Sequence, residues 1–216
     1  MRRVLARHSD VARVTGLVEP FDGERWRVEV KTPDSQFAGS SIGSVFRTGR
    51  GNLEPGKPVT ILYRKPDTVV MSDTPDELSD LLPILIHGHG RVLVNGLGLG
   101  CVVKGLLAKD EVDHIDVVEI DPEIIEHIGP YYEDERVTIY NDNAFTMRWR
   151  PGENWNCVWH DVWSTLCTGN LREADNEAVP GSYEKLHRKY GGRCDWQGSW
   201  GREFLERERA REGGRW

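Results

Sequence analysis

Residues 91–123 read RVLVNGLGLGCVVKGLLAKDEVDHIDVVEIDPE. Their pattern predicts an apolar strand, a Gly-x-Gly-x-Gly turn, a helix and a second apolar strand that ends at Glu119. Glu119 follows Gly96 by 23 positions, close to the spacing of about 20 at which an acidic side chain binds the ribose of a nucleotide. The stretch therefore predicts a binding site for an adenosine-containing cofactor.

The turn itself narrows the kind of cofactor. Glycine is expected at 96, 98 and 100 because a tight turn needs unusual backbone angles and because a ligand close to the backbone leaves no room for a Cβ. The strict dinucleotide fingerprint, counted from Gly96, would place Cys101 at its last position. No Gly-Lys-Ser/Thr follows, which excludes a P-loop, and residues 94–103 contain no Lys or Arg. A ligand without phosphate fits this turn better.

Composition limits the class of protein. The chain has 216 residues, 38% of them hydrophobic, enough for one sizeable core and a small second lobe. The apolar run at residues 81–86 is too short to cross a bilayer, and the N-terminus lacks the apolar stretch of a secretory signal. The four cysteines show no CxxC spacing and are expected to be reduced. We therefore expect a cytoplasmic protein without a membrane segment.

Charge argues against tight non-specific binding of nucleic acid. The net charge is −7, and residues 73–216 carry 16 basic against 27 acidic side chains. Residues 1–72 carry 12 basic against 8 acidic side chains, which leaves a nucleic-acid substrate open without favouring it. His87 and His89 flank Gly88 without further ligands nearby, so no metal site is expected.

The first 72 residues predict a small antiparallel β lobe. Short runs rich in β-branched and aromatic residues are separated by Gly, Pro, Ser and Asp at 11–20, 25–31, 42–47 and 59–64. Thr74 and Pro75 then predict the start of a helix with a capping box to Glu77.

From residue 91 the chain alternates strand and helix. Strands are expected at 91–95, 114–119, 136–140 and 155–160, and helices at 100–109, 122–128 and 143–149. This order predicts a parallel sheet with helices on its faces, whose ligand lies beyond the carboxyl ends of the strands. Gly96, Glu119, Asp142 and Asp161 all fall at such ends, which predicts a single site.

Beyond Trp163 no fifth strand is evident. Residues 170–190 and 195–212 are predicted to be helical, and Trp196, Trp200 and Phe204 form an apolar stripe at four-residue spacing. The parallel sheet is therefore expected to end after its fourth strand. The predicted organisation is a β lobe at 1–72, a cofactor domain at 73–168 and a helical extension with a charged tail at 169–216.

Four segments together resemble a known family. VLVNGLGLG, VVEIDPEII, YYEDERVTIYNDNAF and WNCVWHDVW follow one another as the nucleoside-binding motifs do in class I S-adenosylmethionine-dependent methyltransferases. The spermidine synthase (polyamine aminopropyltransferase) branch is the most similar, and the likeness covers about residues 72–163. The resemblance implies an α/β fold with a Rossmann-like parallel sheet, S-adenosyl-L-methionine as cofactor and a β lobe in front of it.

The resemblance also implies roles for single residues. Gly96, Gly98 and Gly100 would pass under the methionine part of the cofactor, and Glu119 would hold its ribose. Asp142 would accept from the adenine amine. The full set of cofactor contacts implied is Asn95, Gly96, Leu97, Gly98, Gly100, Glu119, Ile120, Asp142, Asn143, Ala144, Asp161 and Trp163.

His160 and Asp161 would stand at the mouth of the active site as catalytic candidates. Strand alternation points their side chains to opposite sides, and we expect Asp161 to face the cleft as a base. A cap of the following turn stays open as an alternative for Asp161. Trp163 fits a core aromatic better than a surface for a cationic ligand. Asp121, followed by Pro122, is expected to cap a helix.

Two departures from the aminopropyltransferase pattern favour methyl transfer. Leu99 stands where that family carries an acidic residue, and Ser164 stands where it carries a second Asp. We therefore expect a methyltransferase with an unidentified small-molecule or protein acceptor, and a homo-oligomer is left open. The alternatives are a polyamine aminopropyltransferase that uses the decarboxylated cofactor, a non-catalytic protein that retains the fold, and, through Cys101, a nicotinamide-dependent oxidoreductase.

Overall fold

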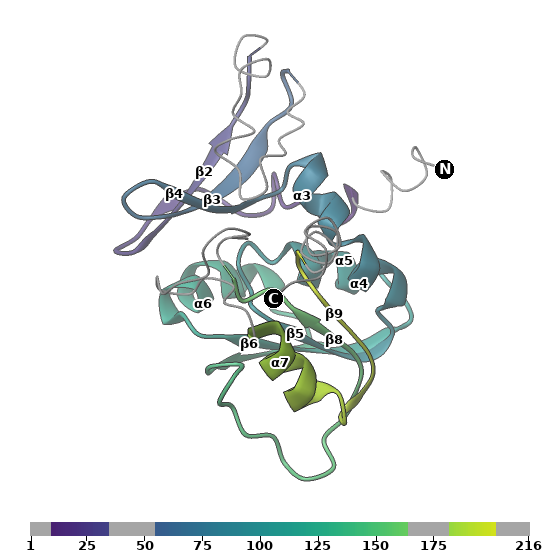
Figure 1. Ribbon diagram of the computed structural model, residues 1–216. Helices are drawn as coiled ribbons and strands as arrows, with labels where there is room; N and C mark the ends of the chain where they lie inside the picture. Colours follow the sequence, from purple (N-terminus) through teal and green to yellow (C-terminus); the bar gives the residue numbers. More distant parts are fainter. Residues whose placement is uncertain (1–9, 35–54, 164–181, 202–216) are drawn as a thin grey trace, which may run out of the picture.

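The computed structural model describes residues 10–34, 55–163 and 182–201. These residues form a four-stranded sheet in the order β1-β2-β3-β4 and a five-stranded sheet in the order β7-β6-β5-β8-β9. Figure 1 shows the first sheet at one end of the molecule, above the domain built on the second. The two parts share one hydrophobic core, to which Val28 and Leu62 of the first sheet belong.

The front sheet is antiparallel. Its strands are β1 Phe21–Asp22, β2 Trp26–Lys31, β3 Val59–Arg64 and β4 Thr68–Ser72. Val28 pairs with Leu62, and Leu62 pairs with Met71, so these three side chains share the face that packs on the rest of the protein. The predicted β lobe is confirmed at these strands.

Residues 11–20 are not the strand that their β-branched content suggested. They form turns, and Ala12, Val14 and Val18 are buried in the main core. The predicted run at 42–47 lies outside the described residues. Two short helices follow the front sheet, α3 Pro75–Asp80 and α4 Leu82–His87.

Helix α3 starts where the sequence predicts, with Pro75 in its first turn and Thr74 at the N-cap. The capping hydrogen bond is not formed, because the Thr74 hydroxyl pairs with the Ser72 hydroxyl at 3.1 Å instead. The helix therefore begins at the predicted residue although the predicted capping hydrogen bond is absent.

The second sheet is parallel throughout. Its elements are β5 Gly90–Asn95, α5 Cys101–Leu107, β6 Val112–Glu119, α6 Pro122–Ile128, the 3-10 helix η2 Gly129–Tyr132, β7 Val137–Asn141, β8 Trp155–His160, α7 Ser182–Tyr190 and β9 Cys194–Ser199. Strand order runs outward from β5 through β6 to β7 and, on the other side, through β8 to β9. The order therefore reverses between β5 and β8, where open α/β sheets bind their ligands.

The reversal also decides where the helices lie. Crossovers between parallel strands are right-handed, so those made by α5 and α6 cover one face and the one made by α7 covers the other. Figure 1 agrees, with α4 and α5 on the side of the front sheet and α7 on the opposite side of the parallel sheet. Burial on both faces explains the apolar runs at 92–94 in β5 and at 117–118 in β6.

Strand β9 corrects two expectations. The sheet does not end after its fourth strand, and the helix predicted for 195–212 is wrong at 195–199, which pair in parallel with β8. Trp196 stacks on Trp159 with ring centroids 6.4 Å apart, and also on His87 at 4.6 Å. Spacing by four fits every second position of a strand as well as one face of a helix, so the aromatic stripe could not separate the two. Phe204 lies outside the described residues.

The helix predicted for 143–149 is also wrong. Residues 144–146 are in a turn, and residues 143 and 147–150 have no regular structure. The Asn143 side chain accepts a hydrogen bond from the Phe145 amide at 2.9 Å, a local turn that competes with helix formation. Among residues 10–34, 55–163 and 182–201, no helix has the length and apolar character needed to cross a membrane.

Candidate cofactor-binding site

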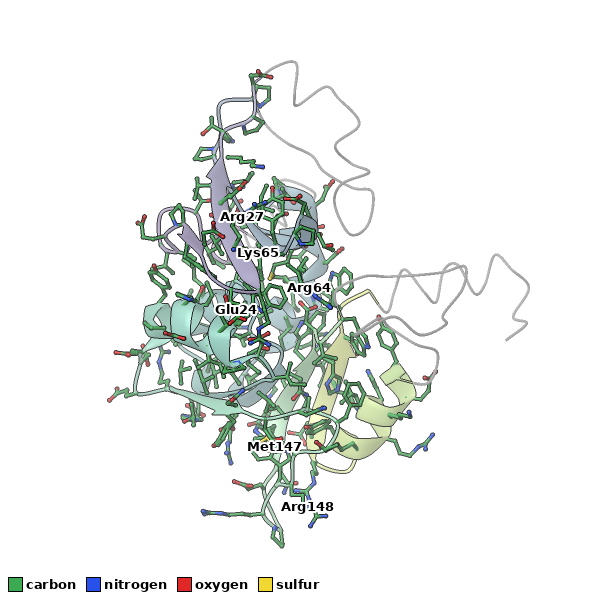
Figure 2. All side chains as sticks on the ribbon, turned by 90° about the vertical axis from the view of Figure 1, so that its left-hand side faces the viewer. Glu24, Arg27, Arg64, Lys65, Met147 and Arg148 are labelled. Carbon is green, nitrogen blue, oxygen red and sulfur yellow. The ribbon has the colours of Figure 1, made fainter. Side chains whose placement is uncertain are left out.

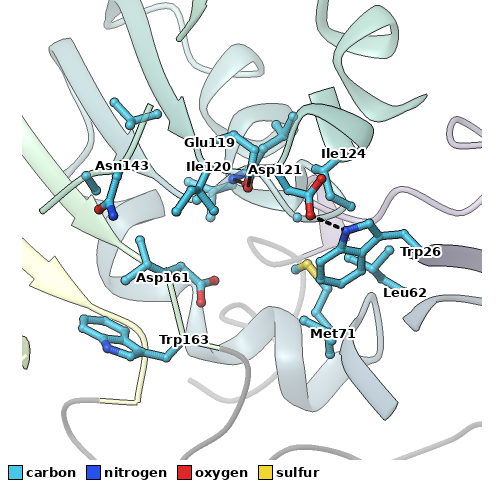
Figure 3. A pocket seen from close by; sticks show the side chains of 18 of the residues that line it. Trp26, Leu62, Met71, Glu119, Ile120, Asp121, Ile124, Asn143, Asp161 and Trp163 are labelled. Carbon is cyan, nitrogen blue, oxygen red and sulfur yellow. Dashed lines mark hydrogen bonds between the residues drawn. The ribbon is translucent and has the colours of Figure 1, made fainter. Parts of the chain in front are cut away.

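A cavity of about 160 Å³ lies at the carboxyl ends of four parallel strands. Its floor comes from residues 96–98 after β5, 119–121 after β6, 142–145 after β7 and 161–163 after β8. Its roof comes from the front sheet, which contributes Trp26, Leu62 and Met71 to the lining (Figure 3). The four strand ends that the sequence predicts to meet therefore do meet, in one cavity.

The Gly-rich turn has the backbone that the sequence predicts. Gly96, Gly98 and Gly100 all have positive φ, of 99°, 53° and 77°. Protein atoms also exclude a Cβ at these positions. A Cβ at Gly96 would collide with the carbonyl oxygen of Asp161, and one at Gly100 with the ring of Tyr132.

Gly98 faces the front sheet. A Cβ at this position would meet the Met71 sulfur, which accepts a hydrogen bond from the Leu99 amide at 3.0 Å. The Leu99 side chain is fully buried in the core and does not line the cavity. Its position therefore cannot act on a cofactor by direct contact, as the sequence comparison with aminopropyltransferases assumed. Gly100 likewise lies outside the lining.

Glu119 is turned toward the Gly-rich turn. Its Oε2 accepts from the Leu97 amide at 2.8 Å and its Oε1 from the Asp121 amide at 2.9 Å. Burial raises the pKa of this carboxyl, while the amides of Asp121 and Leu97 lower it. The Gly98 amide lowers this pKa as well, and Glu119 lines the cavity, where a carboxylate can also accept from a ligand.

Asp121 caps α6, as expected, by accepting from the Glu123 amide at 3.0 Å. It also accepts from the Trp26 indole at 2.7 Å (Figure 3) and from the Arg25 guanidinium at 2.6 Å. Glu123 accepts from the Arg25 amide at 3.0 Å. The start of α6 therefore holds the turn between β1 and β2, a contact across about a hundred positions that no local pattern predicts.

The segment after β7 forms the side of the cavity where the adenine is expected. The Asp142 side chain is exposed and accepts from the Asn143 amide at 2.6 Å, and Ala144 is buried. Ile120 and Phe145 line the cavity although 55% and 37% of their surface is exposed. Exposed apolar side chains on this rim offer contact area for a flat base. Phe145 was missed by the sequence reasoning, although it directly follows the Asp142–Ala144 motif.

His160 does not reach the cavity, which corrects its assignment to the mouth of the site. Its ring is fully buried on the side of α7, where Nδ1 accepts from the Asn95 amide group at 2.8 Å and Nε2 lies 3.3 Å from Gln197 Oε1. Burial lowers the pKa of His160 to about 3. Asn95 is buried as well and does not line the cavity.

Asp161 lies on the cavity side, as strand alternation predicts (Figure 3). Trp163 also lines the cavity but is only 3% exposed and stacks on Tyr183 of α7 at 4.0 Å. Trp163 is therefore a packed core aromatic, as the sequence favours, and part of it also lines the cavity. The described part of the chain contains no group of three or more side chains that could hold a metal ion.

The His160→Gln variant is expected to lose less stability than the wild-type protein as the pH falls from about 6.5 toward 4. The unfolded chain protonates His160 near its ordinary pKa of 6.5, whereas the folded chain resists until about 3. Stability is thus full above pH 6.5 and declines below it by up to about 1.4 kcal/mol per pH unit. Urea unfolding at several pH values measures this slope, and parallel pH profiles for the two proteins would contradict the burial of a neutral imidazole.

Comparison with known proteins adds a curated relative and several solved structures. The polyamine aminopropyltransferase of Agathobacter rectalis is 27% identical over 150 residues, which cover 62% of this chain and 50% of that protein. The chain thus spans about half the length of the curated relative that it matches. No family model matches the chain.

The solved structures are more distant. A putative RNA methyltransferase from Pyrococcus horikoshii gives a TM-score of 0.40 at 18% identity, covering 65% of this chain and 67% of that one. The Thermoplasma acidophilum protein 1320 gives 0.40 at 15% identity, with coverages of 62% and 70%. The five parallel strands, their order and the reversal between β5 and β8 identify the architecture. The chain has a class I methyltransferase-like fold.

Proposed function

We propose that the protein is an S-adenosylmethionine-dependent methyltransferase that acts on a small-molecule or protein acceptor still to be identified. The observation that carries the proposal is the placement of Glu119. Its carboxylate joins the Gly-rich turn to the start of α6 and lines the cavity. A carboxylate in this place can accept hydrogen bonds from the hydroxyls of a ribose.

The remaining walls fit the other parts of this cofactor. Ile120 and Ala144 offer apolar surface for adenine, and the Asp142 carboxylate can accept from its exocyclic amine. The Gly-rich turn leaves its backbone exposed to the methionine part. No Lys or Arg lies in residues 94–103, so the turn suits a cofactor without phosphate.

Arg64 supports a donor that keeps its carboxylate. It ends β3 and lines the cavity, and Figure 2 shows it at the level where the front sheet meets the parallel-sheet domain. No carboxylate of residues 10–34, 55–163 or 182–201 forms an ion pair with its guanidinium. A carboxylate on the ligand would provide that partner, since guanidinium and carboxylate groups match in geometry.

Asp161 is the residue that we assign to the acceptor. The bound cofactor supplies a methyl group already activated by its sulfonium, so the protein chiefly has to align the acceptor with it. The Asp161 carboxylate, on the cavity side of β8, is placed to orient an acceptor and to take its proton. Trp163 and Met71 give this end of the cavity an apolar wall that excludes water.

Aminopropyl transfer is the second candidate, favoured by the relative from A. rectalis. Both reactions use an adenosyl sulfonium, so the ribose and adenine contacts do not separate them. Leu99 is buried away from the cavity and gives no preference, and Ser164 lies outside the described residues. Arg64 is the residue that distinguishes the two donors, because only the intact cofactor carries a carboxylate.

Titration calorimetry of the full chain with four ligands tests the proposal. We expect S-adenosylmethionine and S-adenosylhomocysteine to bind, decarboxylated S-adenosylmethionine to bind about tenfold more weakly, as loss of one charge-assisted contact implies, and NAD not to bind. Tighter binding of the decarboxylated donor would establish the second candidate instead. Binding of none would indicate a non-catalytic protein, and binding of NAD alone an oxidoreductase.

The Arg64→Met variant is the matched control for cofactor choice. It should bind the intact and the decarboxylated donor with similar affinity, because it removes the proposed partner of the carboxylate while keeping most of the side-chain length. An unchanged preference in this variant would mean that another residue recognises the carboxylate.

A further inference from the structure

Residues 142–147, which form the side of the cavity proposed for adenine, are bound by hydrogen bonds from α7. Residues 142–147 have no helical ladder, and two of their carbonyl groups are bound by α7 instead. The Lys189 ammonium donates to the Ala144 carbonyl at 2.7 Å and to the Met147 carbonyl at 2.8 Å. The Tyr190 hydroxyl donates to the same Ala144 carbonyl at 3.0 Å. The segment has backbone hydrogen bonds of its own to the Asn143 carbonyl, and two neighbouring residues of α7 supply the donors for the Ala144 and Met147 carbonyls.

The surroundings of this contact are partly buried and charged. Tyr190 is fully buried, and its hydroxyl lies 3.4 Å from the Trp149 indole nitrogen, which donates to it. Burial lowers the pKa of Lys189, while the negative charge of Asp142 raises it. The ammonium therefore acts on the carboxylate proposed to accept from adenine as well as on the backbone that carries it.

The same helix reaches the other end of the cavity. Tyr183, in the first turn of α7, stacks on Trp163 with an interplanar angle of 19°. Its hydroxyl donates to the Trp200 carbonyl at 3.1 Å, which ties the start of α7 to the end of β9. One nine-residue helix on the far face of the sheet therefore supports the adenine wall at its end and the acceptor wall at its start.

We infer that Lys189, with Tyr190, is a positioning residue for the adenine of the cofactor. This inference rests on the proposed function. Neither side chain lines the cavity, so both act through the Ala144 and Met147 carbonyls. Without the ammonium, these carbonyls lose their charged donor and the 142–147 segment can take other turn conformations. A ligand then has to order the segment as it binds, which lowers affinity and selectivity for the base.

The test uses the Lys189→Met variant of the full chain. We expect its affinity for S-adenosylhomocysteine, measured by calorimetry, to fall about fivefold to tenfold, the size expected for one or two charge-assisted hydrogen bonds. We also expect a smaller preference for S-adenosylhomocysteine over its hypoxanthine analogue S-inosylhomocysteine, because Asp142 is displaced. Lys189→Arg, which keeps the charge and the donors, should restore most of both. Lys185→Met, an exposed lysine of the same helix, is the matched control and should bind as the wild type does.

A second variant keeps the inference testable if Lys189→Met folds poorly. Tyr190→Phe removes one hydroxyl from the Ala144 carbonyl and leaves the packing of the ring, and it should lower affinity by a smaller factor in the same direction. Wild-type affinity and base preference in both variants would overturn the inference, as would a lower melting temperature with an unchanged base preference. A wild-type protein that binds no adenosyl compound would instead overturn the proposed function, and the inference with it.

Discussion

The Glu119→Ala variant is expected to bind S-adenosylhomocysteine at least about a hundredfold more weakly than the wild-type protein. Two ribose hydroxyls would lose a charged acceptor, and hydrogen bonds to charged groups contribute about 1.5–3 kcal/mol each. The Leu97 and Asp121 amides, which donate hydrogen bonds to Glu119 at 2.8 and 2.9 Å, would lose their acceptor as well. Calorimetry near neutral pH measures the change directly.

The pH dependence of S-adenosylhomocysteine binding provides a second test of the role of Glu119. Burial raises the pKa of Glu119 above its ordinary value of 4.5, and the ionised form is the one that accepts from both ribose hydroxyls. Affinity should therefore be full at neutral pH and fall as the pH is lowered through this raised pKa. The Glu119→Gln variant, which has no such titration, should bind weakly with no such dependence on pH.

Asp121→Ala is the matched comparison for Glu119→Ala. It keeps the backbone amide that binds Glu119 but removes the helix cap and the acceptor for Trp26 and Arg25. Loss of a cap costs about 1 kcal/mol, so this variant should chiefly be less stable. Equal losses of affinity in the two variants would show that the ribose ligand and the helix cap cannot be separated as we propose.

The parts of the fold that the sequence predicts well depend on local signals. Helix α6 and strand β8 have the expected bounds, because Asp121 and Pro122 mark a helix start and an apolar run bounded by polar residues marks a buried strand. The convergence of Glu119 and Asp161 at one rim follows from the geometry of parallel strands. Their side-chain directions follow from strand alternation.

The features that the sequence did not predict depend on distant residues. Strand β9 forms because β8 offers it an edge, whereas the spacing of Trp196 and Trp200 suits helix and strand alike. The turns after Asn143 are held by Lys189, more than forty positions away. The roof residue Met71 comes from another sheet and has no motif of its own. Tertiary contacts decided each of these cases, and propensity was the weaker effect.

The Asp73→Ala variant is expected to lower the free energy of unfolding by about 3–5 kcal/mol, the range for removing one partner of a buried, charged hydrogen-bond network. Asp73 follows β4 and is fully buried. Its carboxylate accepts from the Val14 amide at 3.1 Å, the Thr15 amide at 2.7 Å, the Thr15 hydroxyl at 2.6 Å and the Thr60 amide at 2.7 Å. One side chain thus joins the segment before the front sheet to β3 and to the beginning of the cofactor domain.

Removal of this carboxylate leaves three backbone amides without acceptors in a site that water does not reach, and each unsatisfied donor costs about 1–3 kcal/mol. Urea unfolding measures the loss from the midpoint and slope of the transition. Asp67→Ala is the matched control, because Asp67 is exposed and a surface ion pair such as its pair with Arg27 contributes little to stability. A loss at Asp73 no larger than that at Asp67 would mean that residues 10–18 dock through their apolar side chains alone. In that case the affinity of the cavity, which Met71 lines two positions before Asp73, should be insensitive to the same substitution, and calorimetry on the Asp73→Ala protein would show it.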